Sequence, residues 1–386
     1  MTTRLPRYID TADELSAFCA ELADAPWIAL DTEFIRERTY YPKFCLLQIA
    51  SGSHAACIDP LTLTDLSPLH PLLFATTVVK VFHAARQDLE ILYRLLGRIP
   101  EPLFDTQIAA PFIGLPEQAG YATLVQELLN VALDKAHSRT DWASRPLSAE
   151  QLSYAADDVI YLGEIYCLLK DRLSRLGRLE WAIEEMRGLR DASLYAPSAS
   201  DAWQRIGGTA QLSQTQLQRL RALAAWREDT ARTQDCPRGW LIKDDVLVDI
   251  ARRGPSSTAD LARIRALDER SLKRHGHRLL EVLADTTRQD DTDRCTPPPR
   301  TTESPATEAV LDVFSALVKL RASEESLNPT VLAGRRDLRE FLEQPDRSRL
   351  TQGWRNHVIG EDLLAMLRGQ KQLAVVAGRL KVTSGV

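Results

Sequence analysis

Short apolar runs rich in β-branched residues mark the first part of the chain as a succession of strands and helices. Four such runs predict buried strands at residues 28–30, 45–50, 55–58 and 78–82. The first three lie close together, separated by polar or glycine-containing stretches, so we expect antiparallel neighbours. Helical periodicity follows around residues 89–96, 124–129 and 148–173. The pattern predicts an α/β domain over residues 1–190, with a mixed sheet flanked by helices.

Two later blocks, residues 213–286 and 308–380, show helical periodicity alone. Each opens on an apolar helix and continues through a charged turn into a second one, so we interpret them as a tandem repeat of small all-α domains. Shared helical periodicity without a true repeat would give the same pattern. Residues 191–212 have the composition of a linker, and residues 287–307 contain three consecutive prolines and no periodicity, which is typical of a second linker.

The overall composition is that of an ordinary globular protein. The chain has 386 residues, 44% of them hydrophobic and 26% charged, which is enough for about two or three domains. No apolar run approaches the roughly 20 residues that span a bilayer, and the first residues lack a signal-peptide core. Six cysteines without paired spacing support neither a zinc site nor a disulfide framework. We therefore expect a cytoplasmic protein with reduced thiols and no membrane partner.

Charge is spread unevenly along the chain. The net charge is −5, and the first 190 residues hold 18 Lys and Arg against 26 Asp and Glu. Such an acidic domain argues against a protein that binds nucleic acid by electrostatic attraction alone. It is compatible with an acidic site that recruits cations.

The first strand ends on two carboxylates, Asp31 and Glu33, within the stretch Trp-Ile-Ala-Leu-Asp-Thr-Glu-Phe. Residues two apart in a strand point to the same face, so the two side chains should lie side by side. Two unpaired carboxylates in that position repel each other, and burial adds to the cost. A positive partner is expected between them.

A third acid, Asp88, lies where a strand ending near His83 is followed by a helix. Taken alone, Asp88 is best interpreted as a first-turn acid that interacts with the helix dipole. By the same reasoning His83 is a hydrogen-bonded structural histidine rather than a metal ligand or base.

The fourth acid belongs to a helix that should begin at Ser148, since Ser148 and Gln151 have the spacing of a capping box. At about 100° per residue, Asp158 falls inside the apolar stripe of that helix, whereas Asp157 falls on the solvent side. Tyr154 lies one turn before Asp158 and should project beside it. A carboxylate in an apolar stripe needs a compensating partner.

Clusters of carboxylate oxygens suit hard divalent ions such as Mg²⁺ or Mn²⁺ rather than zinc. Two such ions about 3.5–4 Å apart can activate water and stabilise the leaving oxygen of a phosphodiester. The residues alone leave two explanations open: a metal-dependent phosphoryl-transfer site, or structural acids paired with arginines.

The four acids, their order and the position of Tyr154 resemble the tyrosine subgroup of the DEDD exonuclease superfamily. Within it, the chain is most similar to the bacterial ribonuclease D family, through residues 31–34, 40–50, 83–90, 133–135, 141–147 and 154–162. These blocks span nearly all of residues 25–170. The two helical blocks resemble the domain shared by helicases and the C-terminus of ribonuclease D (HRDC), and the second copy is the poorer match.

This resemblance implies a ribonuclease H-like fold and a 3′→5′ exoribonuclease that releases 5′-mononucleotides from precursor tRNA and other small structured RNAs. It implies that Asp31, Glu33 and Asp158 hold the metal ion that activates water, while Asp31 and Asp88 hold a second ion. Tyr154 would position the attacking water, because a tyrosine with a pKa near 10 stays protonated at neutral pH.

Further positions match the family in a less specific way and are candidate substrate contacts. In the first domain these are Gln48, His83, Lys135, Arg139, Trp142 and Arg145. In the first helical block they are Arg238, Trp240 and Lys243. Several of these residues also have a structural alternative. Gln48 could hydrogen-bond backbone groups of its strand, His83 could support the structure around it, and Trp142 could be a buried packing residue. The last three residues could belong to a solvated loop.

We therefore expect a monomeric enzyme with two divalent ions, Mg²⁺ or Mn²⁺, no organic cofactor, and RNA as its partner. Two alternatives remain: a 3′→5′ exonuclease of the same superfamily acting on DNA, and a non-catalytic RNA-binding protein.

Overall fold

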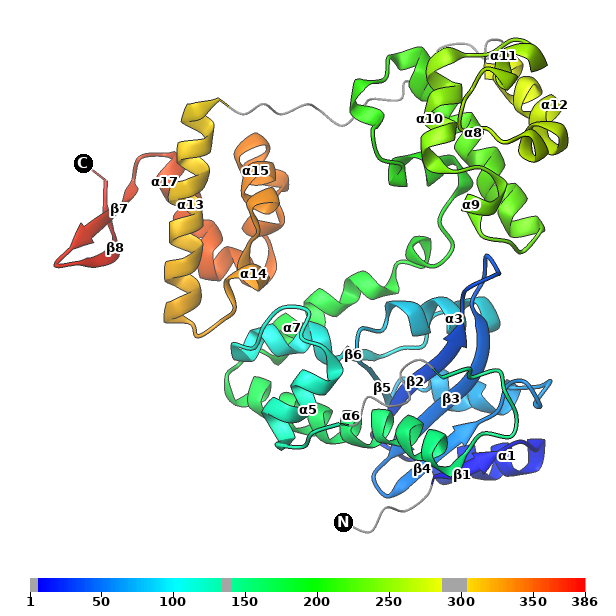
Figure 1. Ribbon diagram of the computed structural model, residues 1–386. Coiled ribbons are helices and arrows are strands. Elements are labelled where there is room, and N and C mark those ends of the chain that lie inside the picture. The colour runs from blue at the N-terminus through cyan, green and yellow to red at the C-terminus, as the bar shows by residue number, and fades with distance from the viewer. Residues whose placement is uncertain (1–5, 134–139, 287–303, 386) are drawn as a thin grey trace. The chain divides into compact units, whose positions relative to one another are not determined.

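The computed structural model describes residues 6–133, 140–286 and 304–385 (Figure 1). Its main sheet has six strands in the spatial order β1-β4-β3-β2-β5-β6. The strands are β1 (Arg7–Ile9), β2 (Trp27–Ile35), β3 (Lys43–Ser51), β4 (His54–Ile58), β5 (Val79–Phe82) and β6 (Leu103–Asp105).

The sheet is mixed, as the sequence predicts. Strand β3 pairs antiparallel with β4, with Leu47 opposite Ile58 and Ser51 opposite His54. The pairs β1–β4, β2–β5 and β5–β6 are parallel. All four predicted strands are present. The sequence analysis missed β1 and β6, because three residues are too few to show alternation.

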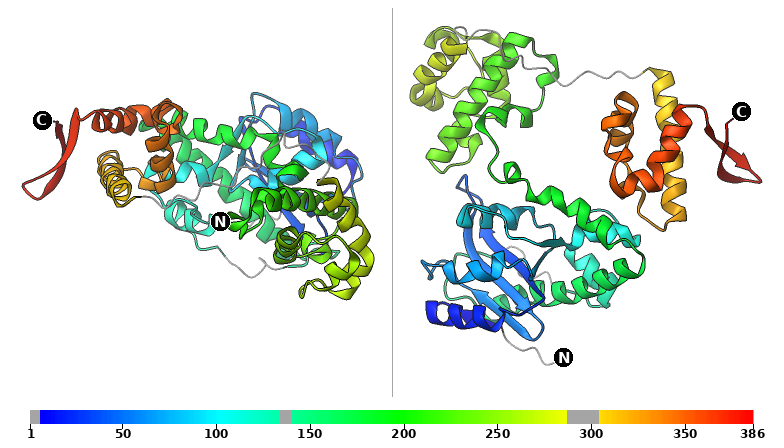
Figure 2. Two further views of the ribbon diagram at one scale, coloured as in Figure 1. Left: turned by 90° about the horizontal axis from the view of Figure 1, so that it is seen from above. Right: turned by 180° about the vertical axis from the view of Figure 1, so that it is seen from behind.

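Helices cover this sheet, and the longest of them, α6, packs across β4 and β5 (Figure 2). The helices of this part are α1 (Ala12–Glu21), α2 (His70–Phe74), α3 (Arg86–Leu96), α4 (Thr106–Ala109), α5 (Tyr121–Leu129), α6 (Ala149–Arg175) and α7 (Leu179–Met186). Helix α6 begins with the predicted capping box: the Ser148 hydroxyl accepts the Gln151 N–H, and the Gln151 side chain accepts the Ser148 N–H.

The apolar stripe of α6 is buried in the core with residues of the sheet. Val159, Leu162 and Ile165 are at most 1% exposed and belong to the same hydrophobic cluster as Val81 and Ala29. Such burial stabilises the fold by roughly 1.5–3 kcal/mol per large aliphatic side chain.

The approach of α6 to the sheet is close at Gly163. A Cβ atom at this position would lie 2.3 Å from the ring of Trp27 in β2. Glycine therefore sets the distance between the helix and the strand that carry the acids.

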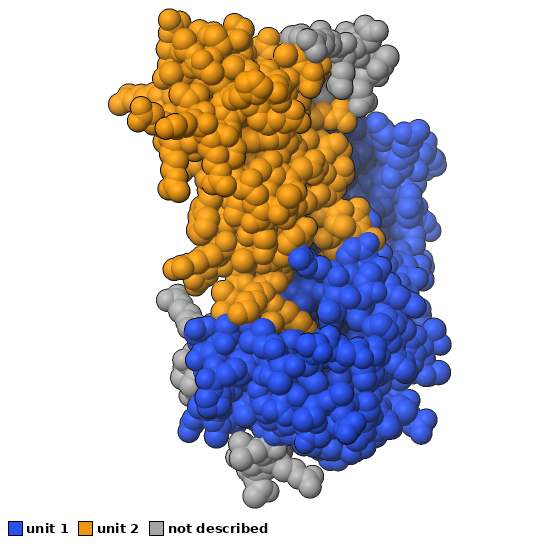
Figure 3. Space-filling view, turned by 90° about the vertical axis from the view of Figure 1, so that its right-hand side faces the viewer, with its two compact units in different colours: residues 1–33, 45–191, 303–386 blue, residues 34–44, 192–302 orange. Residues whose placement is uncertain are grey.

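The chain divides into two compact units (Figure 3): residues 1–33, 45–191 and 303–386 form the first, and residues 34–44 and 192–302 form the second. The second contains the 3₁₀ helix η5 (Ala199–Arg205) and α8 (Gln214–Thr233), α9 (Arg238–Leu241), α10 (Asp244–Arg253), α11 (Thr258–Ala262) and α12 (Glu269–Thr286). Residues Ala202, Trp203, Ile206 and Leu212, within the segment assigned to a linker, are buried in its core.

The C-terminal part of the first unit consists of α13 (Pro305–Glu324), α14 (Pro329–Leu332), α15 (Arg335–Glu343), α16 (Gly353–Arg355), α17 (Glu361–Leu367) and the hairpin β7 (Lys371–Val376) and β8 (Arg379–Ser384). The sequence analysis did not predict this hairpin.

The C-terminal helices pack on α7. Trp354 stacks on Trp181 with ring centroids 5.1 Å apart, and the buried Arg355 pairs with Glu185. Within the described residues, no helix combines the length and the apolar character needed to cross a membrane.

Candidate active site

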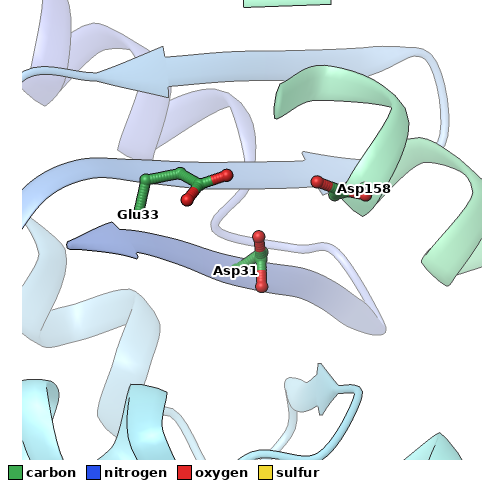
Figure 4. Close-up of side chains that lie close together, drawn as sticks. All are labelled: Asp31, Glu33 and Asp158. Carbon is green, nitrogen blue, oxygen red and sulfur yellow. The ribbon is translucent and has the colours of Figure 1, made fainter. Parts of the chain in front are cut away.

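Three of the predicted acids meet in space. Asp31 and Glu33 extend from one face of β2, and Asp158 reaches toward them from α6 (Figure 4). One carboxylate oxygen from each lies within 4.8 Å of the others. Strand periodicity brings the first pair together, and packing of the apolar stripe of α6 against the sheet brings the third.

Asp88 is the fourth acid, in the first turn of α3, and it is 7% exposed. Its carboxylate accepts a hydrogen bond from the Thr32 hydroxyl, and Thr32 lies between Asp31 and Glu33 on β2. Burial and then the charge of Asp31 raise the pKa of Asp88. Asp88 therefore belongs to the same electrostatic site, although it is not one of the three acids within 4.8 Å.

Burial and mutual repulsion disfavour the ionised forms of these acids. Burial, followed by the charges of Asp31, Asp158 and Asp88, raises the pKa of Glu33 to about 9. Burial and then Asp158 raise the pKa of Asp31, and burial and then Asp157 raise the pKa of Asp158. A divalent cation would reverse this balance, and an all-oxygen donor set fits Mg²⁺ or Mn²⁺.

Asp157 differs from the prediction, because it is partly buried rather than solvated. Burial raises its pKa. Its backbone carbonyl accepts a hydrogen bond from the Tyr121 hydroxyl at 3.0 Å. The two adjacent acids are therefore both partly buried, and only Asp158 belongs to the cluster with Asp31 and Glu33.

Tyr154 lies one turn before Asp158 on α6. Burial, and then the charges of Asp158, Glu33 and Asp31, raise the pKa of its hydroxyl, which remains protonated at neutral pH. Trp142 is 3% exposed, and its ring centroid lies 6.2 Å from that of Tyr154. The structure thus places Trp142 as a packing neighbour of Tyr154.

Gln48 and His83 are both internal. Gln48 is fully buried in β3, and among the described residues neither its amide nitrogen nor its amide oxygen has a hydrogen-bond partner. His83 lies with Nδ1 3.0 Å from the Thr106 hydroxyl, and burial lowers its pKa to about 4. A neutral, hydrogen-bonded His83 has the environment of a structural residue.

Arg145 has its whole guanidinium occupied. It bonds both oxygens of buried Asp59 at 2.7 and 2.8 Å. Its remaining hydrogen bonds go to the carbonyl oxygens of Trp142, Ser144 and Cys45. An arginine has five N–H donors, so these bonds leave none for a phosphate. We assign Arg145 to structural support of the loop before α6.

The other basic candidates differ in exposure. Trp240 is 63% exposed and Lys243 is exposed at the start of α10. Arg238 instead donates to the carboxylate of Glu228 at 3.3 Å. Lys135 and Arg139 lie outside the described residues.

Sequence reasoning missed two residues of the site. Thr32 supplies the hydroxyl that bonds Asp88, and its position between two acids was an available signal. Tyr121 begins α5, and burial and then the charges of Asp158 and Asp31 raise the pKa of its hydroxyl. Nothing in the local sequence around Tyr121 marks it as a neighbour of those acids.

Comparison with known families agrees with this geometry. A model described as a 3′–5′ exonuclease matches residues 6–174, and an HRDC domain model matches residues 216–283. The second HRDC domain expected at residues 308–380 is not confirmed.

Two curated relatives match along nearly their whole length. Ribonuclease D of Sphingobium indicum is 40% identical over 97% of this chain and 98% of its own. Ribonuclease D of Granulibacter bethesdensis is 39% identical over 98% of this chain and 97% of its own.

Among solved structures, Escherichia coli RNase D, described as an exoribonuclease involved in structured RNA processing, superposes with a TM-score of 0.85. The identity is 34%, covering 94% of this chain and 98% of that one.

Proposed function

Because the chain belongs to the ribonuclease D family and is a 3′–5′ exoribonuclease, we propose that it trims precursor tRNA and other small structured RNAs from their 3′ ends and releases 5′-mononucleotides. The observation that carries the proposal is the convergence of Asp31 and Glu33 from β2 with Asp158 from α6, within 4.8 Å. The description of the Escherichia coli relative supports structured RNA as the substrate class.

The proposed mechanism uses two divalent ions, Mg²⁺ or Mn²⁺. Asp31, Glu33 and Asp158 would hold one, while Asp31 and Asp88 would hold the other. When bound, the ions would lower the pKa of the attacking water and offset charge on the leaving oxygen. The raised pKa of Glu33, which repulsion from three acids helps to cause, supports a site built for cations.

We assign Tyr154 to orienting the attacking water. Its hydroxyl remains protonated beside Asp158 and Glu33, so it can form a hydrogen bond but cannot serve as an ionised base. Thr32 would hold Asp88 in position through the hydroxyl hydrogen bond.

Contacts to RNA form the less specific part of the proposal. The buried amide of Gln48 needs partners that the described chain does not supply, and we assign them to the terminal nucleotide or its water. Exposed Trp240 can stack on a base, and Lys243 can meet a phosphate. Lys135 and Arg139 stay proposed phosphate contacts. His83 and Trp142 are proposed as supports.

The helical parts would hold the structured body of the RNA. We propose that residues 308–380 are a divergent second HRDC-like domain after the one at 213–286, and that the enzyme acts as a monomer. The boundary of the exonuclease domain at residue 190 and the linker at 287–307, most of which lies outside the described residues, belong to the same proposal. The linker expected at 191–212 is not kept, because four of its apolar side chains are buried in the core of the second unit.

The deciding experiment is digestion of matched RNA and DNA oligonucleotides with Mn²⁺, with Mg²⁺ and with EDTA. We expect metal-dependent release of 5′-mononucleotides from the 3′ end of RNA. Faster digestion of DNA than of RNA would contradict RNA as the substrate and favour a DNA exonuclease of the same superfamily. No product with either ion would favour a non-catalytic RNA-binding protein.

A further inference from the structure

The segment that joins β2 to β3 leaves the acidic site directly after Glu33. It runs from Phe34 to Phe44, and it belongs to the compact unit formed by the first helical domain rather than to the unit that contains the sheet. Its tip contains Tyr40, Tyr41 and Pro42. These residues match the ribonuclease D family, but the proposed chemistry gives them no role.

Helix α8 binds this segment through both backbone and side chain. The N–H groups of Tyr40 and Tyr41 each donate to the same carboxylate oxygen of Asp235 at 3.1 Å, just beyond the end of α8. The Tyr40 hydroxyl donates to Glu228 and accepts from the Arg232 Nε at 3.1 Å. The Arg232 guanidinium also lies 5.7 Å from the centroid of the Tyr40 ring.

Glu228 is the centre of this arrangement. Its carboxylate is fully buried, with Arg238 at 3.3 Å, Arg232 at 3.6 Å and Arg205 at 3.8 Å. Burial alone would raise the pKa of Glu228, but the Tyr40 hydrogen bond and then the three arginines lower it, so the carboxylate is ionised. An isolated buried carboxylate is costly, so the site requires its surrounding donors. We call these four side chains the Glu228 socket.

The Glu228 socket also accounts for Arg238. The sequence analysis grouped Arg238 with Trp240 and Lys243 as an RNA-binding patch, yet its guanidinium faces Glu228. A charge that balances a buried carboxylate has a structural use within the domain, whereas Trp240 remains 63% exposed.

These contacts bear on the acidic site because the segment that they hold is connected directly to Glu33. Strand β2 ends at Ile35 and strand β3 begins at Lys43. If nothing outside the connection contacted it, the residues between these strands would sample many conformations. The hydrogen bonds at Tyr40 and Tyr41, seven and eight residues after Glu33, remove that freedom. A ligand that is already ordered pays less entropy on binding its metal.

We propose that the Glu228 socket is a positioning device for the reaction: it holds Tyr40, and thereby orders the segment that leaves β2 directly after Glu33, which lowers the entropy that Glu33 loses on binding metal. This inference rests on the proposed function, since it takes Glu33 as a metal ligand. Tyr40, Glu228 and Asp235 are positioning residues and touch no reacting atom.

The test compares Tyr40→Phe and Glu228→Gln with a control, Asp229→Asn, which changes the neighbouring exposed acid on the same helix. Calorimetric Mn²⁺ titration, kinetics on a short single-stranded RNA and amide exchange at Tyr40 and Tyr41 are measured. One lost hydrogen bond corresponds to a roughly two- to tenfold change in an equilibrium. We therefore expect Tyr40→Phe to weaken Mn²⁺ binding by that factor and to speed amide exchange, with Asp229→Asn unchanged.

The double variant Tyr40→Phe/Glu228→Gln should bind Mn²⁺ no more weakly than the weaker-binding single variant, because both substitutions remove the same hydrogen bond. Faster amide exchange with unchanged Mn²⁺ affinity would overturn the proposal, leaving only a structural tie. Unchanged exchange in Tyr40→Phe would also overturn it. Tyr40→Phe carries the test even where Glu228→Gln fails to fold. A wild-type chain that binds Mn²⁺ without releasing mononucleotides would instead contradict the proposed function.

Discussion

Asp31 in β2 and Asp158 in α6 bring carboxylate oxygens within 4.8 Å of each other, although more than a hundred residues of chain separate them. Burial and then the charge of Asp158 raise the pKa of Asp31, so each acid disfavours ionisation of the other until a cation is present. This relationship makes the metal, the acids and the activity depend on one another in measurable ways.

Replacing Asp158 with Asn should lower the rate of mononucleotide release by at least about a hundredfold, since a lost transition-state electrostatic contact costs about that much. The metal-free variant should melt at an equal or higher temperature, because one repulsive charge is gone. The matched control is Asp171→Asn, an exposed acid further along α6, which should keep full activity. Full activity in Asp158→Asn would contradict the assignment.

Tyr154→Phe should lower kcat by roughly a hundredfold and leave KM and Mn²⁺ affinity near the wild-type values, because the hydroxyl orients water without holding metal or RNA. Tyr161→Phe, on the same helix, serves as the control. Steady-state kinetics on a short RNA distinguish these outcomes. A change confined to KM would assign Tyr154 to substrate binding instead.

Stability of the metal-free protein should fall as pH rises. The pKa of Glu33 is raised from 4.5 to about 9, so the folded chain holds a proton that the unfolded chain has lost within this range. The contribution is fully present below about pH 4.5 and is lost as pH approaches 9. Melting temperatures measured with EDTA between pH 6 and 9 should therefore decrease.

Adding Mn²⁺ at pH 7 should raise the melting temperature and release protons, because the bound ion requires ionised ligands. Calorimetry in buffers of different ionisation enthalpy measures this proton release. The variant Glu33→Gln should release fewer protons and show a shallower dependence of melting temperature on pH. Equal proton release in both proteins would remove Glu33 from the metal site.

Gly163→Ala should destabilise the exonuclease part by about 1–3 kcal/mol, because the new methyl group would overlap the ring of Trp27 and push α6 away from β2. The same displacement should weaken Mn²⁺ binding through Asp158. Gly188→Ala is the control, since its Cβ would meet nothing within 4 Å. Denaturant unfolding gives the comparison, and equal stability of the two variants would show that α6 tolerates the shift.

Arg355→Ala should reduce stability by about 3 kcal/mol, because it leaves the partly buried Glu185 without the arginine whose hydrogen bonds do most to lower its pKa. The exposed Arg336 pairs with Glu340 on α15 and is not among the groups that act on Glu185, so Arg336→Ala should leave the free energy of unfolding almost unchanged. Urea unfolding compares the two. Similar small losses would mean that the C-terminal helices contribute little to the stability of the first unit.

The sequence alone determined which residues of a strand or helix share a face. Alternation placed Asp31 and Glu33 on one face of a strand, and the capping box with helical periodicity placed Asp158 in an apolar stripe. Both features are confirmed, because strand and helix periods are properties of a few consecutive residues. Similarity to a known family added chemical roles that periodicity does not contain.

Only the tertiary structure decided which distant groups share a space. It brought the Thr32 hydroxyl to Asp88 and occupied every donor of Arg145. It also placed residues 303–386 in one unit with the sheet, and Tyr40 in the other unit with Glu228. The hydrophobic period of a helix or strand shows which of its faces is buried. Which other element buries that face depends on packing and charge compensation over the whole chain. No local pattern contains that information.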